Sequence, residues 1–321
     1  MNDVAIRVDG LVKDYVTGPP WRRSQAVRAL QGVDLAVDRG EVFGFLGPNG
    51  AGKSTTIRVL LDLLRPTAGH VEMIGGRPAE VGPALRARIG YLPGELNMAG
   101  QRTAGEELRY LATLRGGRGT DRIAELAERF TLDLDRPIRG LSKGNKQKVG
   151  VIQAFMHRPE LLILDEPTSG LDPLLQREFL DLVREAQADG ATVFMSSHVL
   201  SEVEDVAGRV AIIRAGRIVD TDDVRTLRHH AGQLVELRFA APVDVEEFRV
   251  LPGVEDVVAD GDALTCLLRG EPDALLKTAA RHHVLQWSAQ DRELEDLFID
   301  FYRLPVDDTL IASEEVAAHG R

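Results

Sequence analysis

Residues 47–54 constrain this chain most, because they match the G-x-x-x-x-G-K-[ST] pattern of a phosphate-binding loop. The apolar run Val42–Leu46 before the loop suits a buried strand, and residues 55–64 after it carry apolar side chains at helical spacing. The loop must turn its backbone N–H groups toward phosphate oxygens, and glycine lets the chain come that close. The segment therefore predicts a strand, a glycine loop and a helix whose N-terminus binds a nucleotide phosphate.

Two side chains of this loop have a predicted role of their own. Lys53 is expected to reach the β- and γ-phosphates, and the Ser54 hydroxyl is expected to ligate Mg²⁺. The alternative, a glycine-rich turn beside a surface lysine, fits the flanking strand and helix poorly. The predicted phosphate-binding residues are Gly47, Pro48, Asn49, Gly50, Ala51, Gly52, Lys53, Ser54 and Thr55.

A second apolar strand ends in two carboxylates. Leu161–Leu164 is followed directly by Asp165 and Glu166. We expect Asp165 to face the metal, and Glu166, one residue on, to face the γ-phosphate and polarise the attacking water as a general base. The alternative, a strand that ends in ordinary surface acids, is less favoured because the chain also carries a phosphate loop. Together the two segments predict hydrolysis of a nucleoside triphosphate.

Composition excludes several other functions. The formal net charge of -11 argues against a general nucleic-acid-binding surface. Cys266 is the single cysteine, so an intrachain disulfide and a thiolate metal cluster are both excluded. The chain begins with no apolar signal segment, and its apolar runs are too short to span a bilayer. Work at a membrane would therefore require another chain to cross it.

The pattern along the chain predicts two domains. Up to residue 229, buried strands alternate with helical segments, which predicts an α/β fold with a mainly parallel, layered core. Residues 17–24 are expected to form an exposed hairpin loop, and residues 103–157 to be mostly helical. Strands are expected at 4–8, 33–37, 42–46, 70–74, 161–164, 191–196 and 209–213, and helices at 146–156, 173–188 and 199–207. Over residues 230–303 the order becomes βαββαβ, closed by a helix at 293–302, which is the ferredoxin-like α+β pattern. Residues 304–321 are polar and acidic, and are expected to form a flexible tail.

Further motifs between and around these segments resemble those of the ATP-binding subunit of ABC transporters. The resemblance covers residues 4–225 and implies an ATPase domain with a parallel core sheet, an antiparallel β subdomain and a helical subdomain. Besides the phosphate loop and the Asp-Glu strand, the matching segments are the signature-like Leu141-Ser142-Lys143-Gly144-Asn145, the loop Ser169-Gly170-Leu171-Asp172, His198 after a strand end, and Tyr15.

The resemblance assigns a role to each of these residues. Ser142 and Gly144 would clamp the γ-phosphate bound by the partner chain, and Asp172 would lie at the dimer interface. His198 would sense the γ-phosphate, and Tyr15 would stack on adenine. Other interpretations stay open from the residues alone: Ser142 and His198 could be helix caps, and Tyr15 could be a core or edge aromatic.

Two segments depart from the family pattern. Lys143 and Asn145 replace the usual Gly and Gln of the signature, although Ser142 remains. Gly94 stands where the family places a Gln that touches Mg²⁺ and the attacking water, and Glu95 follows it. We expect either that Glu95 substitutes for this Gln or that coupling to the partner runs differently.

The resemblance implies an ATP- and Mg²⁺-dependent ATPase on the cytoplasmic face of a membrane. It would act as a homodimer, or a heterodimer with a second ATPase subunit, and would drive a separately encoded permease, with no nucleic acid involved. Residues 43–50 and the small domain resemble the drug- and polysaccharide-exporting branch. The small domain is expected to serve dimer contact or regulation.

Two alternatives to this function fit less well. A soluble relative acting on ribosomes or DNA would carry a second cassette or a long coiled coil, and residues 55–139 are too short for the latter. A subunit that does not hydrolyse ATP is opposed by the intact Lys53, Asp165, Glu166 and His198.

Overall fold

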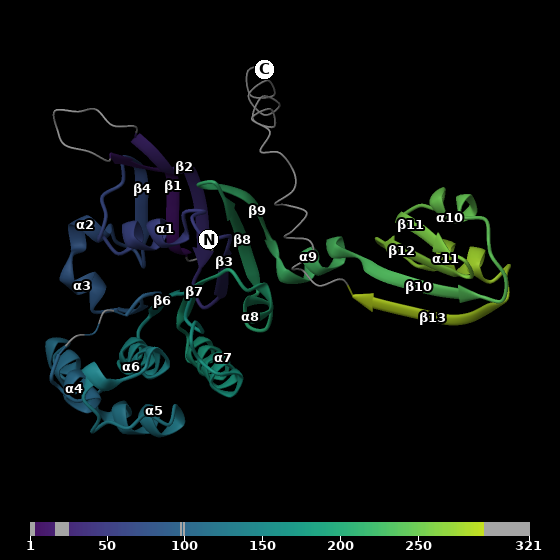
Figure 1. The fold of residues 1–321 in the computed structure, drawn as a ribbon. Coiled ribbons are helices and arrows are strands. Elements are labelled where there is room, and N and C mark those ends of the chain that lie inside the picture. The colour runs from purple at the N-terminus through teal and green to yellow at the C-terminus, as the bar shows by residue number, and fades with distance from the viewer. Residues whose placement is uncertain (1–3, 17–25, 97, 99, 292–321) are drawn as a thin grey trace, which may run out of the picture. The chain divides into compact units, whose positions relative to one another are not determined.

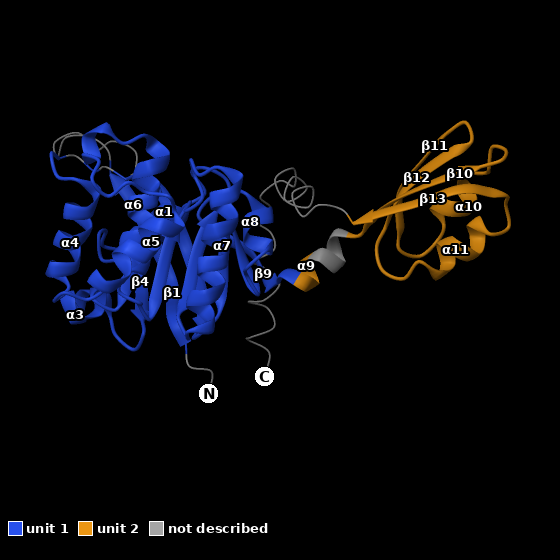
Figure 2. Cartoon of the chain, turned by 90° about the horizontal axis from the view of Figure 1, so that it is seen from below, with its two compact units in different colours: residues 1–224 blue, residues 225–321 orange. Residues whose placement is uncertain are grey.

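The computed structural model describes residues 4–16, 26–96, 98 and 100–291, and the chain divides into two compact units, residues 1–224 and 225–321 (Figure 2). The predicted domain boundary at residue 229 lies within helix α9 (Val224–Ala231) and stays a prediction. The predicted hairpin loop at 17–24, the closing helix at 293–302 and the tail at 304–321 lie outside the described residues.

A six-stranded sheet forms the centre of the first unit, in the order β5-β6-β7-β3-β8-β9 (Figure 1). The strands from β5 to β8 are parallel, and β9 pairs antiparallel with β8 at the edge. The six strands are β3 (Val42–Leu46), β5 (Ile89–Leu92), β6 (Leu161–Asp165), β7 (Thr192–Ser197), β8 (Arg209–Arg214) and β9 (Arg217–Asp223).

Strands β3, β6 and β7 are buried along their whole length, as expected of central parallel strands covered on both faces. The Phe194 ring of β7 contacts those of Phe43 and Phe45 on β3, with ring centroids 6.1 and 5.3 Å apart. The predicted α/β core with a parallel sheet is therefore confirmed. Because β3 and β6 run in the same direction, their carboxyl ends bring the phosphate loop and the Asp165-Glu166 pair to one edge.

A second, antiparallel sheet of the first unit has the order β2-β1-β4. Its strands are β1 (Val4–Val16), β2 (Ala26–Asp38) and β4 (Ala68–Met73). The sequence pattern marked only residues 4–8 and 33–37 as strands. Both strands run further because residues 12–16 of β1 pair with residues 26–31 of β2, although β1 is less buried there.

Helices complete the first unit. The segment expected to be mostly helical contains α4 (Ala104–Leu114), η1 (Thr120–Arg122), α5 (Ile123–Arg129), η2 (Ile138–Gly140) and α6 (Lys143–Phe155). The remaining helices are α1 (Lys53–Leu60), α2 (Pro78–Val81), α3 (Pro83–Arg86), α7 (Pro173–Ala188) and α8 (Leu200–Glu204).

Two helix starts differ from the sequence prediction. Helix α6 begins directly after Ser142, so Gly144 lies in its first turn and not before the helix. Helix α8 begins at Leu200, so His198 precedes the helix by two residues. In both cases the turn that leads into the helix is fixed by a serine hydroxyl, Ser142 or Ser197, whose bonding partner the pattern of apolar residues does not reveal.

The second unit has the predicted ferredoxin-like order. Its antiparallel sheet runs β11-β12-β10-β13, and its apolar core includes Phe239, Phe248 and Cys266. The elements are β10 (Gln233–Phe239), α10 (Glu246–Arg249), β11 (Val254–Asp260), β12 (Ala263–Leu268), α11 (Asp273–Ala279) and β13 (Val284–Asp291). Among the described helices of the chain, none is both long and apolar enough to cross a bilayer.

Candidate nucleotide site

The phosphate loop lies between β3 and α1, as predicted. Gly50 and Gly52 adopt φ of 81° and 117°, in the left-handed region that glycine favours. A Cβ on Gly47 would lie 2.3 Å from the backbone oxygen of Ile213, so this position also has no room for a side chain. No side chain caps the N-terminus of α1, and its first turn carries no acid. Its backbone N–H groups are therefore available for an anion.

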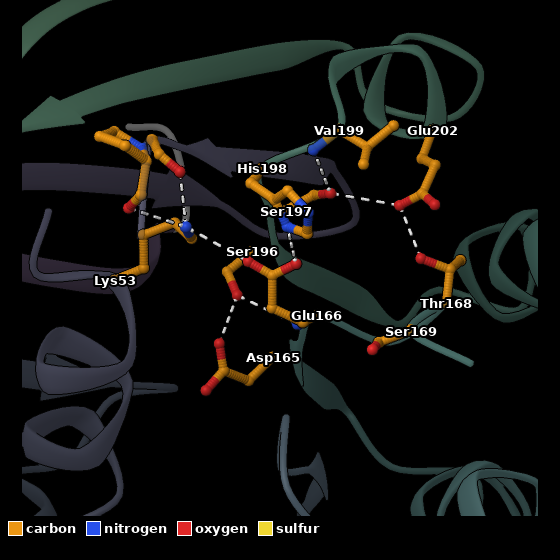
Figure 3. Close-up of polar contacts among 12 residues, drawn as sticks. Lys53, Asp165, Glu166, Thr168, Ser169, Ser196, Ser197, His198, Val199 and Glu202 are labelled. Carbon is orange, nitrogen blue, oxygen red and sulfur yellow. Dashed lines mark hydrogen bonds and ion pairs between the residues drawn. The ribbon is translucent and has the colours of Figure 1, made fainter. Parts of the chain in front are cut away.

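Lys53 is held in place by the loop it follows. Its side chain is buried, and Nζ donates to the backbone oxygens of Gly47 at 2.5 Å and Pro48 at 3.2 Å. The same ammonium lies 3.2 Å from Glu166 Oε1 (Figure 3). A pocket of about 180 Å³ opens beside it, lined by Ala29, Pro48, Asn49, Gly50, Gly52, Lys53, Ser54, Thr55 and Glu166.

Glu166 and His198 meet at the end of the sheet. His198 Nδ1 lies 2.5 Å from Glu166 Oε2, and Figure 3 shows the Lys53, Glu166 and His198 side chains converging. Glu166 has φ of 48°, an uncommon backbone conformation for a residue with a side chain. Glu166 Oε1 is buried and accepts no hydrogen bond among the described residues, since its contact with Lys53 is an ion pair without hydrogen-bond geometry. The uncommon backbone conformation and this unbonded oxygen make Glu166 a candidate for the reactive carboxylate.

Asp165 lies one residue before Glu166 but has a different environment. Its carboxylate is buried, and Oδ1 accepts a 2.6 Å hydrogen bond from Ser196 Oγ on the adjacent strand β7. A Cβ on Gly94 would lie 3.5 Å from Asp165 Oδ2, so Gly94 faces this acid directly. Burial, together with the charge of Asp165, raises the pKa of the nearby Tyr91 hydroxyl. Glu95 is exposed, and its suggested metal role stays a prediction.

Tyr15 lies near the phosphate loop, at the end of β1. Its hydroxyl is 3.4 Å from Thr55 Oγ1, and the Lys13 ammonium lies 5.5 Å from the centre of its ring. The ring is half-buried. Contact with Thr55 supports a place beside the bound nucleotide, although stacking on adenine stays a prediction.

The signature-like segment begins α6. Ser142 is the N-cap of this helix, and its Oγ accepts from Asn145 N at 3.3 Å, while the side chain remains exposed. A Cβ on Gly144 would lie 2.7 Å from the backbone oxygen of Gly170, and Lys143 Nζ donates to Ser169 Oγ at 3.4 Å. Asp172 caps α7 through Leu174 N and Leu175 N, both at 3.1 Å.

These signature residues do not line the pocket beside Lys53 in the part of the chain that the structure describes. Instead the signature segment packs on the loop 169–172 of its own chain. The exposed Ser142 hydroxyl at a helix N-terminus is suited to an anion presented from outside this unit.

The residues present fit a magnesium ion. Ser54 and Asp165 supply oxygen atoms of the kind that Mg²⁺ prefers, and Asp165 Oδ1 is already oriented by Ser196. Ser54 belongs to the first turn of α1, next to Lys53. Ser54 lines the pocket, and Asp165 directly precedes Glu166, which lines it too. A hydroxyl and a carboxylate are donors that magnesium takes when it binds with a nucleotide.

Comparison with known proteins identifies the family. Residues 30–169 match the family model described as ABC transporter. The fluoroquinolones export ATP-binding protein of Mycobacterium tuberculosis is 34% identical over 300 residues, covering 92% of each chain. The daunorubicin/doxorubicin resistance ATP-binding protein DrrA of Streptomyces peucetius is 32% identical over 98% of this chain and 96% of its own.

The chain belongs to the ABC transporter family. Within it, this protein is an ATP-binding subunit with ATPase activity. A solved ATP-binding subunit of an ABC transporter superposes with a TM-score of 0.62 at 32% identity, covering 70% of this chain and 92% of that one. The dimeric cassette MJ0796 bound to ADP and Pi has the same fold, with a TM-score of 0.61 at 22% identity, covering 68% of this chain and 99% of that one.

Several polar residues of the ABC site were not predicted. Ser196 bonds both Asp165 Oδ1 and the Glu166 backbone N–H, and the buried Gln147 of α6 donates to the backbone oxygen of Pro167 at 2.7 Å. The sequence signal for Ser196 is a polar pair, Ser196-Ser197, at the end of an otherwise apolar strand. Gln147 carries no comparable signal, because its partner lies 20 residues away.

Proposed function

We propose that two copies of this chain, or this chain and a second ATPase subunit, close around two Mg·ATP molecules. Each site would combine the phosphate loop of one chain with Ser142 and Gly144 of the other. The observation that carries the proposal is the convergence of Lys53, Glu166 and His198 beside a phosphate-sized pocket. The exposure of Ser142, away from that pocket, supports a role for the signature in a second site.

Hydrolysis follows from the chemistry of these side chains. Lys53 and the N–H groups of the loop hold the β- and γ-phosphates and offset their charge. Glu166 accepts the proton of the attacking water at its carboxylate. Because the Glu166 carboxylate only accepts, His198 Nδ1 is the donor in their bond, and Nε2 donates to a γ-phosphate oxygen in the imidazolium form of the ring.

Magnesium would be held by Ser54 Oγ and, through water, by Asp165. A bound ion would supply positive charge that offsets the negative charge of the phosphates during hydrolysis. Because Gly94 offers no side chain toward Asp165, the remaining coordination would come from ATP and water, or from Glu95. Comparing Gly94→Gln and Glu95→Ala for Mg²⁺ dependence of turnover separates these two arrangements.

We further propose that the protein drives export through a separately encoded permease at the cytoplasmic face of the membrane. The support is similarity over most of the chain to two subunits named for fluoroquinolone export and for daunorubicin and doxorubicin resistance. Closure of the dimer on ATP and its opening after hydrolysis would move the permease helices. The relatives favour this transport role over a soluble ATPase acting on ribosomes or DNA.

The substitution Glu166→Gln tests the proposal, because the amide cannot accept a proton yet keeps the shape of the side chain. We expect this variant to bind Mg·ATP, to lose turnover by about 100-fold or more, and to accumulate as a closed dimer. Light scattering with and without Mg·ATP measures the dimer. Glu128→Gln, an exposed glutamate of α5, is the matched control. Undiminished turnover in Glu166→Gln would remove Glu166 from the reaction.

A further inference from the structure

Glu202, in the first turn of α8, connects two loops of the nucleotide site that are far apart in sequence. Its Oε2 accepts a 2.6 Å hydrogen bond from Thr168 Oγ1 and a 3.2 Å bond from Ser197 Oγ (Figure 3). Thr168 lies two residues after Glu166, and Ser197 lies directly before His198. One carboxylate oxygen therefore holds the segments that carry both members of the Glu166–His198 pair.

The bonds around Ser197 fix the backbone on both sides of His198. Ser197 Oγ donates its proton to Glu202 and accepts from Val199 N at 2.9 Å. A serine hydroxyl can donate one hydrogen bond and accept another, so Ser197 can make both bonds at the same time. His198 sits between Ser197 and Val199, and its imidazole direction depends on this turn. Removing the Glu202 acceptor would leave the Ser197 hydroxyl buried without its partner.

The bond to Thr168 fixes the other segment. Thr168 is 4% exposed and Ser197 is 1% exposed, so both hydroxyls are almost fully removed from water. A carboxylate acceptor makes such bonds shorter and stronger than neutral ones, as the 2.6 Å distance indicates. Gln147 donates a hydrogen bond to the backbone oxygen of Pro167, the residue before Thr168. The loop that follows Glu166 is thus fixed at two successive residues.

A role confined to helix capping does not account for these contacts. A glutamate in the first turn of a helix is favoured by the helix dipole alone. Yet Glu202 reaches Thr168, 34 residues away, and the N-cap residue Val199 is served by Ser197 and not by Glu202. The shorter of the two bonds is the one to Thr168, the partner that is farther away in sequence.

We propose that Glu202 is a positioning residue for ATP hydrolysis, which holds His198 and Glu166 in the geometry seen in Figure 3. This proposal rests on the proposed roles of Glu166 and His198. Glu202 touches neither residue and acts through Ser197 and Thr168. It is therefore expected to affect the chemical step more than the binding of Mg·ATP, which relies on the phosphate loop.

Substitution of Glu202 in the full-length protein tests this. Glu202→Ala removes the acceptor, and we expect kcat to fall about 10- to 100-fold with KM for ATP within about twofold, given what hydrogen bonds to charged groups contribute. Glu202→Gln keeps a carbonyl oxygen for Thr168 and Ser197, and is expected to stay within about threefold of the parent, since only the charge is lost. Glu128→Ala is the matched control, because it removes a glutamate from the exposed face of α5.

A second measurement separates positioning from a merely structural effect. In a His198→Ala background, Glu202→Ala should lower kcat little further, because the effects of two residues that act through one another are not additive. The ring resonances of His198 in NMR spectra should shift in Glu202→Ala and stay near the parental values in Glu202→Gln. Parental kcat in Glu202→Ala, or an equal loss with and without His198, would overturn the proposal. A parent that hydrolyses no ATP would instead overturn the proposed function, and the NMR shifts would still decide the role of Glu202.

Discussion

The nucleotide end of the first unit and the small second unit use polar groups in opposite ways. At the nucleotide end, Lys53, Asp165 and Thr168 are buried with specific partners, and Glu166 has a strained backbone. In the second unit, among residues 225–291, the core cluster is apolar, and ion pairs such as that of Lys277 with Asp273 are exposed. Buried charged groups with specific partners therefore distinguish the candidate nucleotide site. The second unit has the arrangement of most stable domains, with apolar groups inside and charged groups outside.

Charge is the first property on which the two regions can be compared. Lys53→Ala removes a buried ammonium that faces the phosphate pocket, and we expect binding of Mg·ATP and turnover to fall by about 1,000-fold or more. Lys277→Ala removes an exposed ammonium in an i,i+4 pair, worth about 0.5 kcal/mol or less. Fluorescent-nucleotide binding and phosphate release measure both.

The comparison would fail if the two lysines behaved alike. Retained affinity in Lys53→Ala would mean that the nucleotide binds elsewhere, and the assignment of this site would be wrong. A loss of ATPase in Lys277→Ala would instead show that the second unit takes part in the reaction.

Backbone space is the second property. A Cβ on Gly47 would meet the backbone oxygen of Ile213 at 2.3 Å, so the strand end or the loop must shift. We expect Gly47→Ala to cost about 2–4 kcal/mol of stability or to abolish nucleotide binding. Gly261, in the β11–β12 turn, has open space around a Cβ but φ of +64°, so Gly261→Ala should cost only about 1 kcal/mol. Thermal unfolding with and without Mg·ATP distinguishes the two, and equal midpoints for both variants would contradict this.

How far the sequence predicts this molecule depends on whether a feature is local. The α7 bounds follow from Asp172 as N-cap and Pro173 as the first helical residue, and the structure has the helix at Pro173–Ala188 as predicted. Strand β5, which has only four residues and includes a glycine, Gly90, was not predicted from the sequence. In fact Gly90 is required by packing, since a Cβ there would lie 2.2 Å from the backbone oxygen of Ala154 in α6.

The site shows the same division. The side chains proposed to act on the phosphates and the metal lie in short motifs, so Lys53, Asp165 and Glu166 could be predicted from spacing alone. The groups that orient them could not be, because Ser196 and Glu202 act across 31 and 34 residues on Asp165 and Thr168. Contacts of that range depend on sheet order, which periodicity does not encode.

The pH dependence of stability is the third property on which the two regions can be compared, and the expected difference is smaller. His157, after α6, is largely buried, and burial, with repulsion from Arg115, lowers its pKa from 6.5 to about 4. The folded state therefore favours the neutral ring. The contribution of His157 to the free energy of unfolding is fully present above pH 6.5 and is lost as the pH falls toward 4. Between pH 7 and 5 this amounts to about 2 kcal/mol, at roughly 1.4 kcal/mol per pH unit below the ordinary pKa.

Hydrogen exchange measures this loss. Protection of the β5 and β6 amides should decrease from pH 7 to 5 after correction for intrinsic exchange rates, and His157→Gln should reduce that decrease. The glutamine can still donate to the backbone oxygen of Ile89, which His157 Nε2 contacts at 3.2 Å. His282→Gln in the second unit is the control and should leave β5 and β6 unchanged. An unaltered pH dependence in His157→Gln would assign the linkage to other groups.

The smallest effect on the nucleotide site is expected from removing the second unit altogether. Each unit has its own apolar core, so a chain ending at Ala231 should keep its affinity for Mg·ATP within about twofold. Dimerisation should weaken, because β13 forms an edge of the second sheet and presents Leu285 and Trp287, which are 58% and 36% exposed. Sedimentation at several protein concentrations measures this. If the shortened chain kept its dimerisation, ATPase rate and transport, the second unit would not have the expected role in dimer contact or regulation. The two regions would then differ as a nucleotide site and a domain that only stabilises the fold.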